Sequence, residues 1–167
     1  KRLICPVISV GNITVGGTGK TPIVEFLAKR CKEKGYRVAI LSRGYKKPSQ
    51  NNSSPVTVVS DFESIITNWE TAGDEPYLLA QALPGVAVLV GNSRIETGQY
   101  AVKQLGANLI LLDDGFSHIQ LYRDLDIVLI DSTNPLGYGY ILPRGLLREP
   151  ASALGRADAI ILTRTKD

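Results

Sequence analysis

The chain has 167 residues, of which 44% are hydrophobic and 21% are charged. These values are typical of ordinary folded domains and exclude a disordered, collagen-like or coiled-coil chain. The length corresponds to about one domain. The net charge of +3 is too small to indicate nucleic acid as a partner, and no apolar run approaches the roughly 18 residues that span a bilayer.

Two cysteines, Cys5 and Cys31, are too few for a disulfide framework. Each lies in a mostly apolar stretch, so we expect both to be small buried side chains in a reducing compartment. The sequence contains no methionine. Because apolar runs lie close to both ends, we expect the chain to be part of a longer protein.

Short apolar runs alternate with helical patterns along the chain. In chain order, they predict a strand over 3–10, a glycine-rich turn over 11–19, a helix over 20–34, a strand over 37–41, a polar loop over 46–55, a small hairpin over 56–67, a helix over 74–83, a strand over 86–90, a helix over 93–105, and strands over 109–112, 126–130 and 159–162. This alternation predicts a three-layer α/β domain with a mostly parallel sheet and helices on both faces. The glycine-rich turn before the first helix makes the expected domain similar to nucleotide-hydrolysing domains with a phosphate-binding loop.

Several residues refine these elements. Pro6 confines regular pairing of the first strand to its second half. Gly35 fits the position after the first helix, and Ser93 is expected to cap the helix that follows it. Residues 132–157 contain no clear element, and so long a segment indicates a functional loop or local helix. The first helix is expected to bury one face made of Ile23, Phe26, Leu27 and Cys31.

The turn over 11–19 leads into Lys20 and Thr21 and lies between a strand and a helix, which is the context of a phosphate-binding loop. Glycines let backbone N–H groups turn toward the phosphates together with the helix N-terminus. Lys20 would reach the β- and γ-phosphates, and the Thr21 hydroxyl would bind Mg²⁺. The residues expected to bind the nucleotide are Thr14, Val15, Gly16, Gly17, Thr18, Gly19, Lys20 and Thr21.

The loop is a variant, because the strict pattern has glycine where this chain has Thr14. Its Gly-Gly-x-Gly-Lys-Thr core resembles the loop of partition-type ATPases. Those proteins carry a second lysine where this chain has Val15, so that lysine has no counterpart here. An ordinary glycine turn is the structural alternative.

Asp113 and Asp114 directly follow the apolar run over 109–112. A carboxylate at the end of a strand beside a phosphate-binding loop can hold Mg²⁺ or its water shell. Asp113 is the better ligand by position, whereas Asp114 starts the loop and could turn either way. A turn-forming Asp-Asp-Gly without a metal is the alternative.

Four further residues have a functional and a structural interpretation. Asp74 is either a helix N-cap or a general base that takes a proton from an attacking hydroxyl. Arg43 follows a strand, at the edge where ligands bind, or is a solvated loop charge. Arg94 could counter phosphate charge, since arginine is disfavoured in a first helical turn. His118, the only histidine, either orients a carboxylate or phosphate or is a hydrogen-bonded structural residue.

A second group of charges, Arg144, Arg148 and Glu149, lies in the long segment over 132–157 and is typical of a solvated surface. Asp131 ends a strand and is interpreted as a turn residue.

Six stretches resemble the tetraacyldisaccharide 4′-kinase family of Gram-negative bacteria. They occur in family order and span nearly the whole chain: VISVGNITVGGTGKTP (7–22), LSRGY (41–45), GDEP (73–76), DDGFSH (113–118), RDLD (123–126) and LLREP (146–150). The family usually has Gln at the position of Ser117 and Ala at the position of Arg144. It also has a hydrophobic N-terminal helix and a C-terminal domain, so residues 1–167 would form only its nucleotide-binding domain.

The resemblance implies ATP- and Mg²⁺-dependent phosphorylation of the 4′-hydroxyl of an acylated glucosamine disaccharide 1-phosphate in lipid A biosynthesis. The enzyme would be peripheral, on the cytoplasmic side of the inner membrane, with membrane contact through parts outside these residues. The implied catalytic residues are Asp74 as the base, Lys20, Asp114, His118 and Arg94. The implied Mg²⁺ ligands are Thr21, Asp113, Asp114 and Glu149. The implied substrate contacts are Arg43, Tyr45, Asp74, Glu75 and Arg94.

Two other functions remain compatible with the residues. A regulatory ATPase or GTPase of the partition type would act on a protein partner, although Val15 removes the extra loop lysine and the spacing of Lys166-Asp167 does not match a guanine-reading motif. A kinase that phosphorylates a soluble small molecule would have the same phosphate-binding loop. Only the family resemblance distinguishes it from the lipid kinase.

Overall fold

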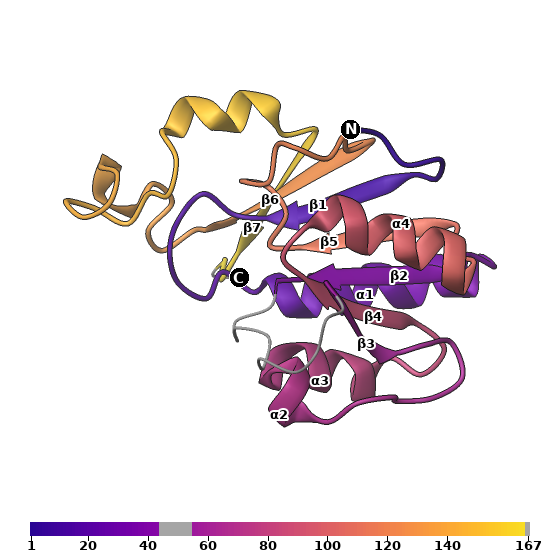
Figure 1. Ribbon diagram of the computed structural model, residues 1–167. Helices are drawn as coiled ribbons and strands as arrows, with labels where there is room; N and C mark the ends of the chain where they lie inside the picture. Colours follow the sequence, from indigo (N-terminus) through magenta and orange to yellow (C-terminus); the bar gives the residue numbers. More distant parts are fainter. Residues whose placement is uncertain (44–54, 166–167) are drawn as a thin grey trace.

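The computed structural model describes residues 1–43 and 55–165 (Figure 1). Its centre is a seven-stranded sheet with the order β3-β4-β2-β5-β1-β6-β7. The strands are β1 Val7–Gly11, β2 Val38–Ser42, β3 Val56–Ser60, β4 Ala87–Gly91, β5 Leu109–Asp113, β6 Leu125–Asp131 and β7 Ala159–Thr163. The pairing between β3 and β4 is antiparallel and the other pairings are parallel, which confirms the mostly parallel sheet.

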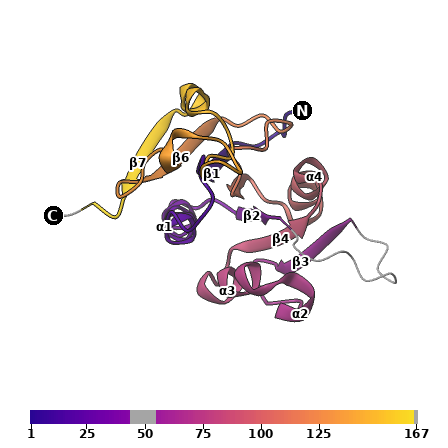
Figure 2. The same ribbon diagram turned by 90° about the vertical axis from the view of Figure 1, so that its left-hand side faces the viewer.

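Helices cover both faces of this sheet, which confirms the three layers (Figure 2). Their bounds are α1 Lys20–Glu33, α2 Trp69–Ala72, α3 Asp74–Ala82 and α4 Arg94–Leu105, with 3₁₀ turns at η1 Gly137–Gly139 and η2 Ala151–Arg156. On one face, α1 and α3 pack against β1, β2, β4 and β5. On the other face, α4 covers β2, β4 and β5, whereas η2 packs beside β6.

The central strands are buried along their whole length. Every residue of β2, β4 and β5 is buried, as expected for parallel strands that are covered on both faces and read as continuous apolar runs. The edge strand β7 alternates between half-buried and exposed residues. The core therefore lies on both faces of the middle of the sheet, around β5 and its neighbours β1 and β2.

Local signals in the sequence account for most element ends. Regular pairing starts at Val7, directly after Pro6. The helix α1 ends where Gly35 adopts a φ of 87°, a conformation that favours glycine. The Ser93 side chain accepts a hydrogen bond from the Glu96 N–H and caps α4. All three expectations are confirmed.

Other predictions on local structure were wrong in part. The buried residues of α1 are Val24 and Ala28, and Phe26 is 54% exposed, because its position lies about 200° around the helix from Val24. Cys5 and Cys31 are free and only partly buried, and burial is the main cause that raises the pKa of each thiol.

Two segments also differ from the sequence prediction. The strand over 56–60 joins the main sheet, and the return segment pairs with it through a single bridge between Ser60 and Ile65. The short helix α2 was not predicted. Residues 132–157 contain the two 3₁₀ turns, in agreement with the local helix expected there. The loop expected over 46–55 lies, except for Pro55, outside the described residues.

No helix in the described part of the chain is both long enough and apolar enough to cross a bilayer.

Substitution of Gly11 by alanine should destabilise the fold. A Cβ atom there would lie 2.6 Å from the Phe116 Cβ and 2.7 Å from the Phe116 backbone nitrogen, so backbone would have to move. We expect a loss of about 1–3 kcal/mol in the free energy of unfolding, measured by urea denaturation. Gly155→Ala is the matched control, because nothing lies within 4 Å of its Cβ position. Equal stability of the two variants would contradict the close approach.

Candidate functional site

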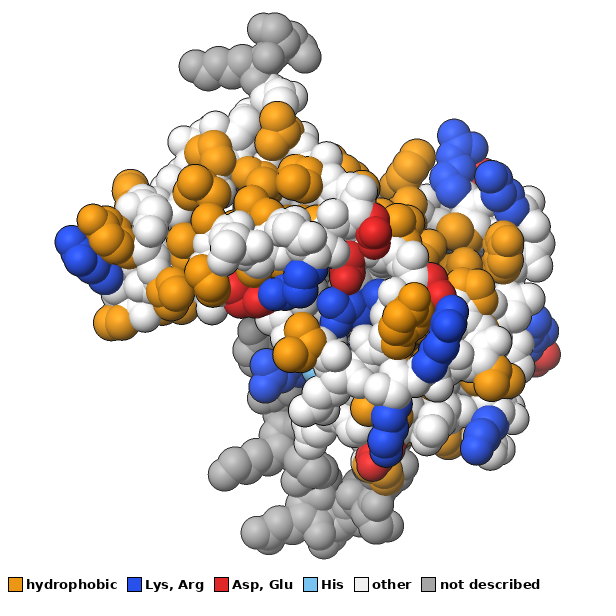
Figure 3. Space-filling view, turned by 90° about the horizontal axis from the view of Figure 1, so that it is seen from above, with side chains coloured by type: hydrophobic (Ala, Val, Ile, Leu, Met, Phe, Trp, Pro, Cys, Tyr) orange, Lys and Arg blue, Asp and Glu red, His pale blue; other side chains and the backbone are white. Residues whose placement is uncertain are grey.

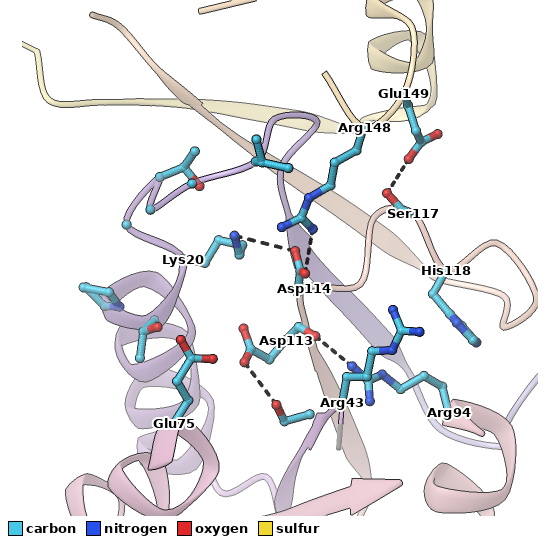
Figure 4. A pocket seen from close by; sticks show the side chains of 18 of the residues that line it. Lys20, Arg43, Glu75, Arg94, Asp113, Asp114, Ser117, His118, Arg148 and Glu149 are labelled. Atoms are coloured by element: carbon cyan, nitrogen blue, oxygen red, sulfur yellow. Dashed lines mark hydrogen bonds and ion pairs between the residues drawn. The ribbon is translucent and has the colours of Figure 1, made fainter. Parts of the chain in front are cut away.

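A cleft of about 1560 Å³ opens at the carboxyl ends of the central strands (Figure 4). This volume exceeds the roughly 300–1,000 Å³ of most small-molecule sites, so the cleft has room for more than one ligand. Its lining includes Val15, Gly16, Gly17, Thr18, Gly19, Lys20, Thr21, Ser42, Arg43, Glu75, Arg94, Asp113, Asp114, Ser117, His118, Arg148, Glu149 and Arg164. Most of the predicted site residues are therefore brought together.

Parallel pairing places these side chains at one edge. Val10 of β1 is opposite Asp113 of β5, and Leu41 of β2 is opposite Leu112. The glycine-rich loop leaves the end of β1, and the two aspartates end β5. Since β1 and β5 are neighbours, the loop and the carboxylates face each other across the cleft, as the sequence predicted.

The glycine-rich loop has the backbone conformation that its glycines allow. Gly16 has a φ of 112° and Gly19 a φ of 78°, values that L side chains rarely adopt. Gly19 is the N-cap of α1, and no side chain caps that helix end. The first N–H groups of α1 therefore remain directed at the cleft, where an anion could bind them.

Lys20 is held at the mouth of this loop by two oxygen atoms. Its Nζ donates to Asn12 Oδ1 at 3.1 Å and lies 3.6 Å from Asp114 Oδ1. Asn12 is buried and donates in turn to the Thr14 carbonyl at 2.8 Å. Asn12 thus connects the lysine to the backbone of the loop itself.

A remote segment pairs with the start of the loop. The Val15 N–H donates to the Leu146 carbonyl at 2.8 Å, and the Arg148 N–H donates to the Ile13 carbonyl at 2.7 Å. We call residues 146–148 the strap. The strap carries the Arg148 side chain to Asp114, where Nη1 lies 2.7 Å from Oδ2. Arg148 is therefore part of the site, and its interpretation as a solvated surface charge was wrong.

Both aspartates face the cleft because the chain turns between them. Asp114 has a φ of 52°, in the left-handed region, so the alternation of side chains along a strand does not continue through it. Asp114 is exposed and lies between the cations of Lys20 and Arg148. Asp113 is 7% exposed and accepts a hydrogen bond from the Ser42 hydroxyl at 3.4 Å.

Burial raises the pKa of Asp113, and the negative charges of Asp114 and Glu75 raise it further. Carboxylates crowded at a buried position are destabilised unless a cation joins them. The described residues contain no cluster of three or more acidic, histidine or cysteine side chains that could enclose a metal by themselves. One or two carboxylates, such as those of Asp113 and Asp114, fit Mg²⁺, which is commonly held by so few carboxylates together with phosphates and water.

Arg94 begins α4 but turns its guanidinium into the protein. It is 4% exposed and donates to the carbonyls of Asp113 at 3.1 Å and Gly91 at 3.4 Å. Burial lowers its pKa to about 10, against the opposing effect of the two aspartates. The side chain thus supports the turn after β5 and places positive charge beneath the cleft.

His118 lies close enough to Arg43, Arg94 and Arg123 to feel their charges. Its Nε2 is buried without a hydrogen-bond partner in the described part of the chain. Burial lowers the pKa of His118, and the charges of Arg94, Arg123 and Arg43 lower it further. Burial and the three arginines therefore favour the neutral imidazole.

Glu149 lines the cleft beside Ser117. Its carboxylate accepts a hydrogen bond from Ser117 Oγ at 2.6 Å and pairs with Arg156 at 2.7 Å. Burial alone would raise the pKa of Glu149, but these two partners outweigh it and lower the pKa. Ser117 donates to this carboxylate directly.

Asp74 lines a smaller pocket of about 260 Å³, which shares Arg43 and Glu75 with the main cleft. Its interpretation as an N-cap was wrong, because Gly73 occupies the N-cap and Asp74 is the first helical residue of α3. Asp74 is exposed and lines the smaller pocket, and it is not among the residues that line the main cleft. Tyr45 lies outside the described residues.

The sequence and the fold have named relatives. A model of the family described as tetraacyldisaccharide-1-P 4′-kinase matches residues 1–167. The chain belongs to this family. Members named tetraacyldisaccharide 4′-kinase are 53% identical over 163 residues in Syntrophus aciditrophicus and 49% identical over 164 residues in Pelobacter propionicus. The family resemblance drawn from the motifs is thus confirmed.

A solved structure agrees with the kinase fold. The crystal structure of LpxK from Aquifex aeolicus in complex with ATP is 45% identical, with a TM-score of 0.88 over 98% of this chain. The match covers 50% of that chain, and the matches to the two relatives cover 43% and 45% of their lengths. The chain spans about half the length of the kinases it matches.

Four residues in or beside the cleft were missed or undervalued in the sequence. Asn12 and Ser42 are polar residues that end or follow buried strands, and such positions at a ligand-binding edge were an available signal. Arg148 and Arg164 reach the cleft from sequence positions far from the loop, so only the fold reveals them.

Because His118 is the only histidine, its titration can be followed without assignment by NMR of the imidazole ring. The folded protein should titrate below the ordinary value of about 6.5, because burial and three arginines disfavour the charged form. The unfolded protein in urea should titrate near that value. The Arg43→Gln variant should move the folded value upward. A folded value above 6.5 would contradict the described environment.

The lowered pKa of His118 also determines whether the free energy of unfolding rises or falls with pH. The folded state binds fewer protons on His118 than the unfolded state does, so this residue costs stability as the pH falls through about 6.5. In urea unfolding, the wild type should lose more stability than His118→Gln between pH 7.5 and pH 5. An equal loss in both proteins would show that His118 titrates alike in the two states.

Proposed function

We propose that the protein transfers the γ-phosphate of ATP, with Mg²⁺, to the 4′-hydroxyl of a tetraacyldisaccharide 1-phosphate during lipid A biosynthesis, as the nucleotide-binding part of a longer chain. The observation that carries this proposal is the meeting of the glycine-rich loop with Asp113, Asp114 and Arg148 in one cleft, in a chain whose family is named for that reaction. Family membership favours this reaction over nucleotide-dependent regulation of a protein partner.

The loop supplies the nucleotide end of the reaction. Backbone N–H groups over 16–21 would bind the phosphates of ATP, since the Val15 N–H already donates to the Leu146 carbonyl, and Lys20 would neutralise the β- and γ-phosphates. The Lys20 ammonium group contacts Asp114 and Asn12, so it lies beside the loop that would bind the phosphates. LpxK from Aquifex aeolicus, which shares this fold, is the relative solved with ATP.

Thr21 and Asp113 are the residues that fit Mg²⁺ best. Asp113 is buried and crowded by negative charge, whereas the Asp114 and Glu149 carboxylates are already paired with Arg148 and Arg156. When bound, Mg²⁺ would neutralise charge on the phosphates during transfer. Asp114 would instead keep Lys20 and Arg148 in position.

The acceptor would enter from the side of the smaller pocket. Asp74 would accept the proton of the attacking hydroxyl, because it is exposed in the smaller pocket and adjoins Glu75, which lines both cavities. Arg43, Tyr45 and Glu75 would contact the acceptor, and buried Arg94 would support phosphate charge from beneath. His118, neutral near pH 7, would orient one of these groups.

The acceptor is a lipid, so we place the whole enzyme at the cytoplasmic side of the inner membrane, as a peripheral protein. Membrane contact would come from parts of the longer chain outside these residues. Nucleic acid is not proposed as a partner, because the net charge is only +3.

The direct test is transfer of ³²P from γ-labelled ATP to the acylated disaccharide 1-phosphate by the full-length protein. Lys20→Ala should weaken ATP binding and reduce transfer strongly, since the γ-phosphate loses its cation. Asp113→Asn should reduce transfer at every Mg²⁺ concentration. Slow ATP hydrolysis with no labelled lipid in the wild type would contradict the kinase proposal.

Asp74→Asn should separate chemistry from binding. If Asp74 is the general base, kcat should fall by about 10²-fold or more, whereas the Kd for ATP should stay within about twofold. Glu96→Gln is the matched control, because Glu96 is an exposed acidic residue in the first turn of another helix. Unchanged kcat in Asp74→Asn would exclude the base role.

A further inference from the structure

Arg164, directly after β7, bridges two parts of the chain that are far from it in sequence. Its Nη1 lies 2.7 Å from Asp131 Oδ2 at the end of β6, and its Nη2 donates to the Gly17 carbonyl at 2.8 Å. Gly17 and Arg164 are 147 positions apart. One guanidinium therefore connects the end of the sheet to the tip of the glycine-rich loop.

The backbone of Arg164 is itself fixed. Its φ of 55° lies in the left-handed region, which a non-glycine residue keeps only where surrounding contacts hold it. Two such contacts are present, since the Ser132 hydroxyl donates to the Arg164 carbonyl at 2.8 Å and the Ser132 N–H donates to the Thr163 carbonyl at 3.0 Å. The guanidinium thus extends from a rigid point.

Asp131 is held from the other side. Its Oδ1 accepts hydrogen bonds from the Thr133 N–H at 2.9 Å and from the Thr133 hydroxyl at 2.6 Å. These bonds are the main cause that lowers the pKa of Asp131, and Arg164 adds to the effect. The carboxylate stays ionised and oriented, and it directs one edge of the guanidinium so that the other edge reaches Gly17.

A bond to the Gly17 carbonyl has a consequence for the next residue. In a trans peptide the carbonyl oxygen and the following N–H point in opposite directions, so fixing the oxygen of Gly17 fixes the direction of the Thr18 N–H. Without such a bond, the Gly16-Gly17 pair would allow this peptide to rotate freely. The positively charged guanidinium bonded to the Gly17 carbonyl also polarises the peptide and strengthens the Thr18 N–H as a donor.

We propose that Arg164 is a positioning residue that fixes the Gly17–Thr18 peptide, so that the Thr18 N–H is preset to bind a phosphate group of the nucleotide. This inference rests on the proposed function, because it assigns the ligand of the loop to a nucleoside triphosphate. Asp131 is the partner that orients the guanidinium. The pair acts on binding of the phosphates before and during transfer alike, so it affects KM for ATP more than kcat.

The test compares Arg164→Ala, Arg164→Lys and Asp131→Asn in the full-length protein. ATP binding is measured by titration calorimetry without acceptor, and KM for ATP and kcat are measured with it. Arg164→Ala should weaken ATP binding by about fivefold or more, a modest value because the side chain is 60% exposed. Arg164→Lys should recover part of the loss, since an ammonium can reach one partner but not both in fixed geometry. Asp131→Asn should give a smaller loss.

The matched control is Arg30→Ala, which removes an exposed guanidinium paired with Glu33 at the opposite end of α1. An equal loss of ATP affinity in Arg30→Ala and Arg164→Ala would overturn the proposal, as would unchanged affinity in Arg164→Ala or a fall in kcat with constant KM. If the wild type bound no ATP, the proposed function and this inference would both fail. Because binding is measured without acceptor, ATP binding without lipid phosphorylation would count against the proposed function alone.

Discussion

The site depends on the parallel pairing of β1 with β5 at the centre of the sheet. This pairing sets Val10 beside Asp113, and from there one chain continues into the glycine-rich loop and the other into the paired aspartates. Gly11 and Phe116 then approach so closely that no side chain fits between them. Phe116 is buried with Ile13 and Leu147, so the same small core fixes the loop, the aspartates and the strap. A shift of one residue in this register would separate Lys20 from Asp114.

Charge is the second constraint on the cleft. Burial raises the pKa of Asp113 and lowers that of Arg94, and the attraction between the two groups opposes both shifts. Asp114 lies between Lys20 and Arg148 and satisfies two cations at once. Such an arrangement suits a ligand that carries both signs, because a phosphate chain with its divalent cation can replace each of these internal pairs. Figure 3 shows basic and acidic side chains side by side near the centre of the face seen there, between apolar regions.

The sequence predicted the parts of this arrangement that local chemistry determines. Most strands and longer helices along the chain, the Ser93 cap, the glycine-rich loop and the edge occupied by Asp113 follow from short local patterns, and the structure agrees. Phe26 was misplaced because apolar residues occur on two sides of α1, and only packing decides which side is buried. The helix α2 is a single turn after Asn68, too short for periodicity to reveal.

Long-range contacts explain what the sequence could not predict. Arg148 and Arg164 reach the loop only because the strap and β7 pass beside it, and nothing in their neighbouring residues indicates this. Asp114 could be placed on the cleft only through its left-handed turn. Motif resemblance supplied the names of several of these residues, but their contacts came from the fold.

The way the loop is secured also determines when it can be completed. The strap and Arg164 come long after the glycine-rich loop in the chain, yet both hold this loop, which begins directly after the first strand. A chain synthesised from its N-terminus therefore exposes the glycine-rich loop long before its supports exist. The loop therefore gains its full set of contacts only after β6 and β7 have joined the sheet.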